Sequence, residues 1–182
     1  MAGTPYIVTA GIVLRETETK EADKILTLLT RDRGKIAVIA RGARRKSCKY
    51  AACAQSLAYS EWTLYQKGDW YYANEGSTLE LFNGLRTDLD AMALGFYFAE
   101  MTEAVTTEET AAAELLRHLL NGLYALSALH KPPALVKPAF ELKLLCLATS
   151  RWRTAVPIAA VLTRSGLCWM WYRASCGAPG AA

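Results

Sequence analysis

The sequence of 182 residues lacks several features that define common classes of protein. Its longest apolar run has eight residues, from Ala155 to Leu162, whereas a transmembrane helix needs roughly 20. The N-terminal stretch MAGTPYIVTAG has neither the basic start nor the apolar core of a secretion signal. The five cysteines have no paired spacing, which predicts reduced thiols rather than a disulfide framework. We therefore expect a cytoplasmic protein that does not associate with membranes.

Signatures of catalysis are also missing. The sequence contains no glycine-rich phosphate loop, no HExxH and no GxSxG. His118 and His130 lie in or beside a leucine-rich segment, where we expect surface or capping roles. The closest acidic pairs stand where helices are predicted to begin, and they are Asp88 with Asp90 and Glu108 with Glu109. Carboxylates at such positions favour the positive end of the helix dipole, so we predict no catalytic residue, no cofactor and no enzymatic activity.

Metal-ligand spacing is not found among the cysteines. Cys48 and Cys53 are five residues apart, and Cys168 and Cys176 are eight apart. Structural zinc sites need four ligands at short paired spacings. We predict that the protein carries no stoichiometric zinc.

Charge divides the chain into three segments. Residues 1–83 have a net charge of +3, residues 84–150 a net charge of −3, and residues 151–182 a net charge of +4 with no acidic residue. The first and second segments also differ in their hydrophobic periodicity. We predict a domain over each of these two segments and an atypical tail after them.

The first segment has the alternating pattern of short β-strands. The predicted strands cover residues 6–14, 24–30, 35–41 and 60–66, with a fifth that opens at 70–73. In the first of these, one face is wholly apolar; it consists of Tyr6, Val8, Ala10, Ile12 and Leu14. Five short strands in about 80 residues suit a small closed barrel of the OB type. The non-alternating gap from Gly42 to Ser56 is predicted to form an insert with a short helix.

The second segment is predicted to be helical. Apolar residues recur at helical spacing over residues 87–101, 111–129 and 140–147. Thr106 and Glu109 have the spacing of a capping box before the second helix, and Pro138 is expected to begin or break the third. The fold class is therefore α+β: a five-stranded OB-type barrel followed by a small, incomplete helical domain.

A basic cluster is the most specific feature. No acidic residue occurs between Asp32 and Glu61, and that window contains seven cations, namely Arg33, Lys35, Arg41, Arg44, Arg45, Lys46 and Lys49. Barrels of this kind bind single strands with a basic groove and aromatic stacking surfaces. The candidate stacking residues are Tyr50, Trp62, Tyr65, Trp70, Tyr71 and Tyr72, about half of which strand alternation exposes. The alternatives are a solvated loop without a partner and an adaptor whose basic loop binds an acidic protein.

In this context the chain resembles the bacterial recombination mediators of the RecO family. The segments that carry the resemblance are TETKEADKIL (17–26), Gly34, VIARGARRKS (38–47), Leu85 with Asp88 and Leu89, and FELKLLCL (140–147). The resemblance covers about residues 4–148 and implies an N-terminal OB barrel and a helical C-terminal domain. It also implies binding of single- and double-stranded DNA, strand annealing, and cooperation with RecR and the single-strand-binding protein in loading RecA. The family's DNA-binding positions correspond to Arg41, Arg44, Arg45 and Lys46, with Lys35 and Lys49 as neighbours.

The tail departs from the family pattern, which has a glycine-tyrosine turn and paired cysteines after the FELKLL-like helix. Residues 151–182 instead hold three of the five tryptophans and no Asp, Glu or Lys. We interpret this tail as a change of reading frame near residues 148–151, followed by an early stop. The alternative is a genuine, divergent C-terminus, and translating the coding DNA in the other two frames distinguishes the two.

Overall fold

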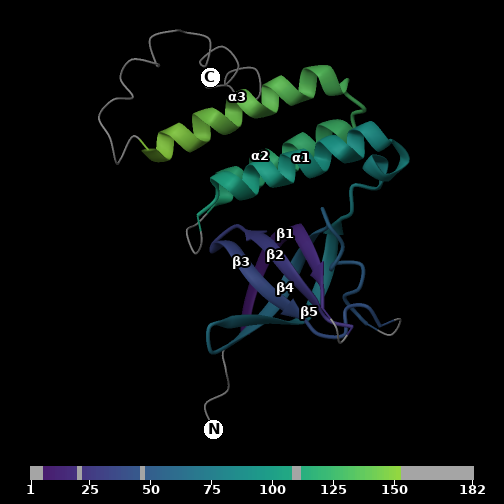
Figure 1. Cartoon of the computed structure of the whole chain (residues 1–182), viewed down its shortest axis with the longest axis vertical. Coiled ribbons are helices and arrows are strands. Elements are labelled where there is room, and N and C mark those ends of the chain that lie inside the picture. Colours follow the sequence, from purple (N-terminus) through teal and green to yellow (C-terminus); the bar gives the residue numbers. More distant parts are fainter. Residues whose placement is uncertain (1–5, 20–21, 46–47, 108–111, 153–182) are drawn as a thin grey trace, which may run out of the picture.

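The computed structural model describes residues 6–19, 22–45, 48–107 and 112–152, with side chains up to Thr149. Figure 1 shows a barrel of strands with the helices stacked on one side of it. The strands are β1 (Tyr6–Glu18), β2 (Lys24–Thr30), β3 (Gly34–Ala40), β4 (Tyr59–Lys67) and β5 (Trp70–Glu80). The helices are the 3-10 helix η1 (Asn83–Thr87) and the α-helices α1 (Leu89–Val105), α2 (Ala113–Ser127) and α3 (Pro133–Trp152).

The five strands form a closed barrel in the order β1-β2-β3-β5-β4. All neighbouring strands are antiparallel except β3 and β5, which pair in parallel through Val38 with Tyr71 and Ile39 with Tyr72. Closure pairs the backbone of every strand on both sides, so that no sheet edge is left open. The predicted OB-type barrel is confirmed.

The wholly apolar face of β1 does not point into the barrel. Val13 is fully buried inside the barrel, whereas Tyr6 and Val8 are 63% and 62% exposed. Ile12 and Leu14, on the same side as Tyr6, pack against the helices instead. Alternation alone cannot tell which face points inward, because the opposite face also carries large apolar residues, Ile7 and Val13.

The insert between β3 and β4 contains turns rather than the predicted short helix within its described residues. Arg45, Cys48 and Ala51 each donate a backbone hydrogen bond to the residue three positions earlier, but these turns do not propagate into a helix. The insert packs onto β5 at Gly76, where an added Cβ would lie 3.2 Å from both Cys53 Sγ and Tyr50 Cβ. A Cβ at this position would be in tight contact with the insert, so that Tyr50 and Cys53 would have to shift by a few tenths of an ångström to admit it.

The ends of the helices agree with the sequence in part. Asp88 caps α1 as expected, because its carboxylate accepts a hydrogen bond from the Asp90 N–H at 2.9 Å. Thr106 does not cap α2; its hydroxyl donates to the Thr102 carbonyl at 2.6 Å and closes α1. Helix α3 begins at Pro133 and continues through Pro138, so that Pro138 neither begins nor ends it.

A second hydrophobic core, distinct from the one inside the barrel, lies between the helices and the barrel. Ile12 and Leu14 of β1 and Leu29 of β2 are buried together with Leu119 and Leu123 of α2. In Figure 1, α1 and α2 lie next to the barrel and α3 lies on their far side. The outward side of α3 leaves Leu135, Leu142 and Leu145 more than half exposed. No helix in the described part of the chain is long and apolar enough to cross a membrane.

His118 lies inside the helical layer, which corrects the expectation of a surface or capping role. Its side chain is 5% exposed and stacks on Phe140 of α3, with 4.3 Å between the ring centroids. Nε2 donates to the Phe140 carbonyl oxygen at 3.0 Å. Burial, assisted by the charge of Lys143, lowers the pKa of His118 to about 4 despite this hydrogen bond.

This lowered pKa makes the stability of the fold depend on pH. Above pH 6.5 His118 is neutral in both the folded and the unfolded chain, and its contribution is complete. As the pH falls from 6.5 to 4, His118 becomes protonated in the unfolded chain but stays largely neutral in the folded chain. The free energy of unfolding should therefore fall by about 3 kcal/mol over this window.

Urea denaturation of the wild type and of His118→Gln between pH 7 and pH 4 measures this effect. The variant cannot titrate at position 118, so its stability should change less with pH than that of the wild type. Identical pH profiles for the two proteins would contradict a neutral, buried His118.

Candidate nucleic-acid interface

The basic cluster lies where β3 ends and the insert begins, and hydrogen bonds fix this point to the start of β2. Gly42 has φ of +66°, a left-handed conformation that favours glycine. Its N–H donates to Asp23 Oδ1 at 2.6 Å, and the Arg44 N–H donates to the Ala22 carbonyl at 3.1 Å. The turn that carries the cations is therefore held to the barrel by its backbone.

The cations of this turn differ in exposure and pairing. Arg41, Arg44, Arg45 and Lys49 are exposed, and Lys46 lies outside the described residues. Arg44 Nη2 lies 3.4 Å from Glu18 Oε2, with side chains 44% and 61% exposed; such a pair contributes little to stability. Among the residues that the structure describes, Arg45 and Lys49 pair with no carboxylate.

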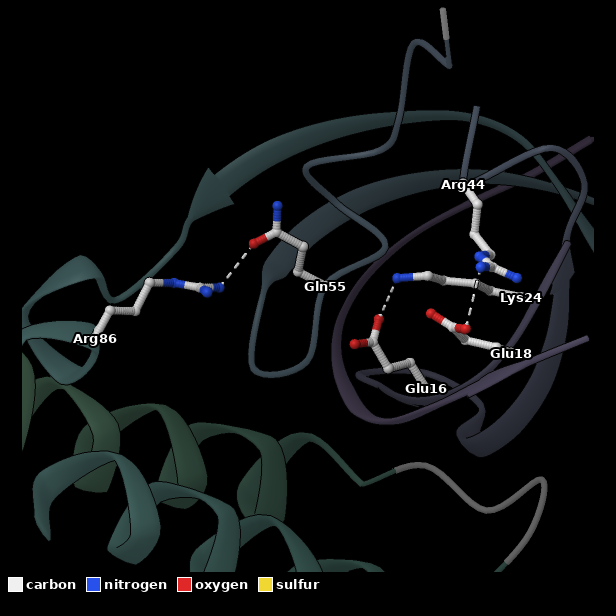
Figure 2. Close-up of polar contacts among 6 residues, drawn as sticks. All are labelled: Glu16, Glu18, Lys24, Arg44, Gln55 and Arg86. Atoms are coloured by element: carbon white, nitrogen blue, oxygen red, sulfur yellow. Dashed lines mark hydrogen bonds and ion pairs between the residues drawn. The ribbon is translucent and has the colours of Figure 1, made fainter. Parts of the chain in front are cut away.

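Two further contacts, drawn in Figure 2, hold the surroundings of the turn in place. Lys24 Nζ of β2 lies 2.7 Å from Glu16 Oε2 of β1, so the charge of this lysine is neutralised. At the other end of the insert, Arg86 Nη2 of η1 donates to Gln55 Oε1 at 2.8 Å. Together with the hydrogen bond from Gly42 to Asp23 at its start, the contact between Arg86 and Gln55 joins both ends of the insert to neighbouring elements.

The structure does not bring all seven predicted cations together. Lys35 lies on the outer face of β3 at its beginning, whereas Arg41 follows its end. Six residues of extended chain correspond to about 20 Å. Arg33 precedes β3, and its Nη1 donates to the Tyr71 hydroxyl at 3.0 Å. Of the described cations, the cluster at the insert therefore contains Arg41, Arg44, Arg45 and Lys49.

Tyr50 is a component of the core rather than an exposed stacking surface. Its side chain is 8% exposed and meets the Trp62 ring edge-on, with 6.3 Å between the centroids. Its hydroxyl donates to the Arg41 carbonyl at 2.6 Å, and burial raises its pKa to about 12. This corrects the expectation that its ring accompanies the basic side chains as a stacking surface.

The other candidate aromatic residues divide between the two faces of the barrel. Trp62 and Tyr71 point inward and are buried, whereas Trp70 is 47% exposed. Tyr65 and Tyr72 lie half-buried on the outer face, and their rings stack at 5.3 Å with planes 15° apart. Sequence reasoning missed Tyr6, which joins them through strand pairing that is not visible in the sequence.

These outer rings form a continuous row. Tyr6 of β1 pairs with Tyr65 of β4, and Tyr65 pairs with Tyr72 of β5. The Tyr6 and Tyr65 ring centroids are 6.5 Å apart, and the guanidinium of Arg41 lies 4.8 Å from the centroid of Tyr72. We refer to Tyr6, Tyr65 and Tyr72 as the tyrosine row; Arg41 joins it to the basic cluster.

No group of three or more His, Cys, Asp or Glu residues suitable for a metal is found in the part of the chain that the structure describes. Cys168 and Cys176 lie outside that part, and so does the tail from residue 153 onward. The absence of zinc and the change of reading frame therefore stay predictions.

The closed barrel, its strand order and the basic insert after β3 define an OB-fold protein with a helical layer. Residues 1–82 match the family model "Recombination protein O N terminal", and residues 86–148 match "Recombination protein O C terminal". The chain belongs to the RecO family, as its sequence predicted.

Among its relatives is the DNA repair protein RecO of Acetivibrio thermocellus, 36% identical over 140 residues, which are 77% of this chain and 56% of the relative. The DNA repair protein RecO of Caldicellulosiruptor bescii is 37% identical over 139 residues, 76% of this chain and 57% of the relative. That of Clostridium novyi is 31% identical over 137 residues, 75% of this chain and 54% of the relative. The chain spans about half the length of the curated relatives it matches.

Substitutions at Tyr50 test its structural role. Tyr50→Phe removes the hydrogen bond to the Arg41 carbonyl but keeps the ring, and should lower the free energy of unfolding by about 1 kcal/mol. Tyr50→Ala also removes the ring and should cost about 3–5 kcal/mol. Urea denaturation of the three proteins measures both values, and a Tyr50→Ala variant as stable as the wild type would show that the ring is not packed as described.

Proposed function

We propose that this chain binds DNA through the basic cluster at the β3 end of the insert and acts as a recombination mediator in DNA repair. The observation that carries the proposal is the set of exposed cations Arg41, Arg44, Arg45 and Lys49 on a turn fixed to an OB barrel. Clustered cations bind the phosphate backbone independently of base sequence. Membership of a family whose curated relatives are called DNA repair proteins supports the same function.

The proposal extends to the finer activities that the family resemblance implies. The chain would bind single- and double-stranded DNA, anneal complementary strands, and assist RecA loading together with RecR and the single-strand-binding protein. Lys35 and Lys46 would add to the phosphate contacts. None of these steps requires a catalytic group, because binding and annealing only bring backbones and bases together, and we therefore propose a non-enzymatic role in the cytoplasm.

The salt dependence of DNA binding tests the contribution of the basic cluster. If five cations meet phosphates of a single strand, log K should fall with log salt at a slope of about −3.5. Replacing Arg44, Arg45 and Lys49 together by Ala should reduce the magnitude of this slope by about 2, and should weaken binding to all sequences alike. Fluorescence anisotropy with labelled oligonucleotides at several salt concentrations measures both.

A matched control replaces Arg31, Arg117 and Lys131 by Ala, which removes the same charge at exposed positions outside the cluster and the insert. This control should leave the slope nearly unchanged. If both triple variants lose affinity equally, net charge rather than the cluster drives binding. If the wild type binds no DNA at all, the alternative of an adaptor that binds an acidic protein through its basic loop is favoured.

A further inference from the structure

We propose that the tyrosine row is a stacking surface for the unpaired bases of single-stranded DNA, adjoining the phosphate contacts of the basic cluster. The inference rests on the proposed DNA-binding function and specifies which part of the nucleic acid meets the outer wall of the barrel. Its basis is the arrangement of Tyr6, Tyr65 and Tyr72 on three neighbouring strands, with Arg41 next to them at the start of the insert.

The row lies across the strands rather than along one of them. The order β1-β4-β5-β3 within the closed barrel places the three rings side by side, with Arg41 following the last strand. Tyr6 meets Tyr65 edge-on, with 6.5 Å between the centroids and planes 78° apart, whereas Tyr65 stacks on Tyr72 at 5.3 Å. The Arg41 guanidinium lies 4.8 Å from the Tyr72 centroid, so that each member of the row contacts the next. The site thus has an aromatic part next to a basic part. A single strand of nucleic acid has the complementary parts side by side, namely flat bases and a negatively charged backbone.

Packing against the protein does not account for the exposed end of the row. Tyr65 and Tyr72 are half-buried and cover one another, as aromatic cross-strand pairs commonly do. Tyr6, however, is 63% exposed, and Val8 on the same face of β1 is 62% exposed. Most of Tyr6 is therefore accessible to a ligand, and the protein contacts its ring through Tyr65 on one side.

The chemistry of the row favours unpaired bases over a protein or duplex partner. A tyrosine ring stacks on any base because every base has a π-face, and such contacts contribute about 1–3 kcal/mol per base. In a duplex the bases already stack on one another and present only their edges in the grooves. Arg41, at the end of the row, is followed by the exposed cations Arg44 and Arg45. These cations can bind the phosphates of a strand whose bases stack on the tyrosine row.

Variants of the row, tested against two kinds of strand, separate base stacking from phosphate binding. The double variant Tyr6→Leu/Tyr65→Leu keeps apolar volume but removes two stacking rings. One labelled ligand is an oligothymidylate of about 15 nucleotides, within the site sizes of OB folds, and the other is an abasic strand of equal length and charge. Fluorescence anisotropy gives both affinities, and thermal unfolding of each variant confirms that it is folded.

The double variant should bind oligothymidylate about 100-fold more weakly, a factor of ten for each lost ring. Its affinity for the abasic strand and the slope of log K against log salt should not change, because the phosphate contacts remain. The single variant Tyr6→Leu, at a largely exposed position, should show about a tenfold loss. The control Tyr124→Leu removes a tyrosine of α2 that is 52% exposed, and should bind both strands as the wild type does.

Each alternative result has a distinct meaning. If the double variant binds oligothymidylate as tightly as the wild type, the stacking surface is refuted while the proposed DNA binding stands. An equal loss for both strands refutes it too, because the rings would then act on the phosphate contacts or on the fold. If the wild type binds neither strand, the proposed function itself fails, and the stacking surface fails with it.

Discussion

The packing of Tyr50 beneath the Arg41 carbonyl determines where this chain presents its positive charge. Tyr50 is twelve residues before Trp62 in the sequence but touches it in the barrel core, and its hydroxyl reaches back to the residue that ends β3. The insert is therefore closed on itself by one buried side chain. This hydrogen bond closes the segment from residue 41 to residue 50. The exposed cations Arg44 and Arg45 therefore stay next to the end of β3.

The sharing of β1 between two cores is the second constraint on the architecture. Val13 fills the barrel, while Ile12 and Leu14 fill the space between the barrel and the helices. A strand with two apolar faces is needed where a sheet is covered on both sides. This requirement explains why the helical layer lies against β1 and β2, and why the remaining outer wall, formed by β3, β4, β5 and the start of β1, is left for side chains of another kind.

Much of this arrangement could be predicted from the sequence, because local patterns carry it. Alternation located all five strands, the capping position of Asp88 located the start of α1, and the acid-free window located the basic turn. The inward face of β1 could not be predicted, since both of its faces are apolar. The burial of Tyr50 and the alignment of Tyr6 with Tyr65 depend on which residues meet across the barrel, and no local pattern records such pairings. The distance between Lys35 and Arg41, by contrast, follows from the predicted strand over residues 35–41, because its two ends lie about 20 Å apart.

The two halves of β1 have a consequence for how substitutions in this strand would be tolerated. Within one run of alternating residues, positions 12 and 14 are packed by the helices and positions 6 and 8 face solvent. Polar replacements at the first pair would be limited by folding, because they put a polar group into a core. Replacements at positions 6 and 8 would be limited only by the ligand or partner that binds the outer face of β1. Different positions of one strand are therefore under different constraints. Residues 6 and 8 can change between relatives without loss of stability, whereas residues 12 and 14 cannot.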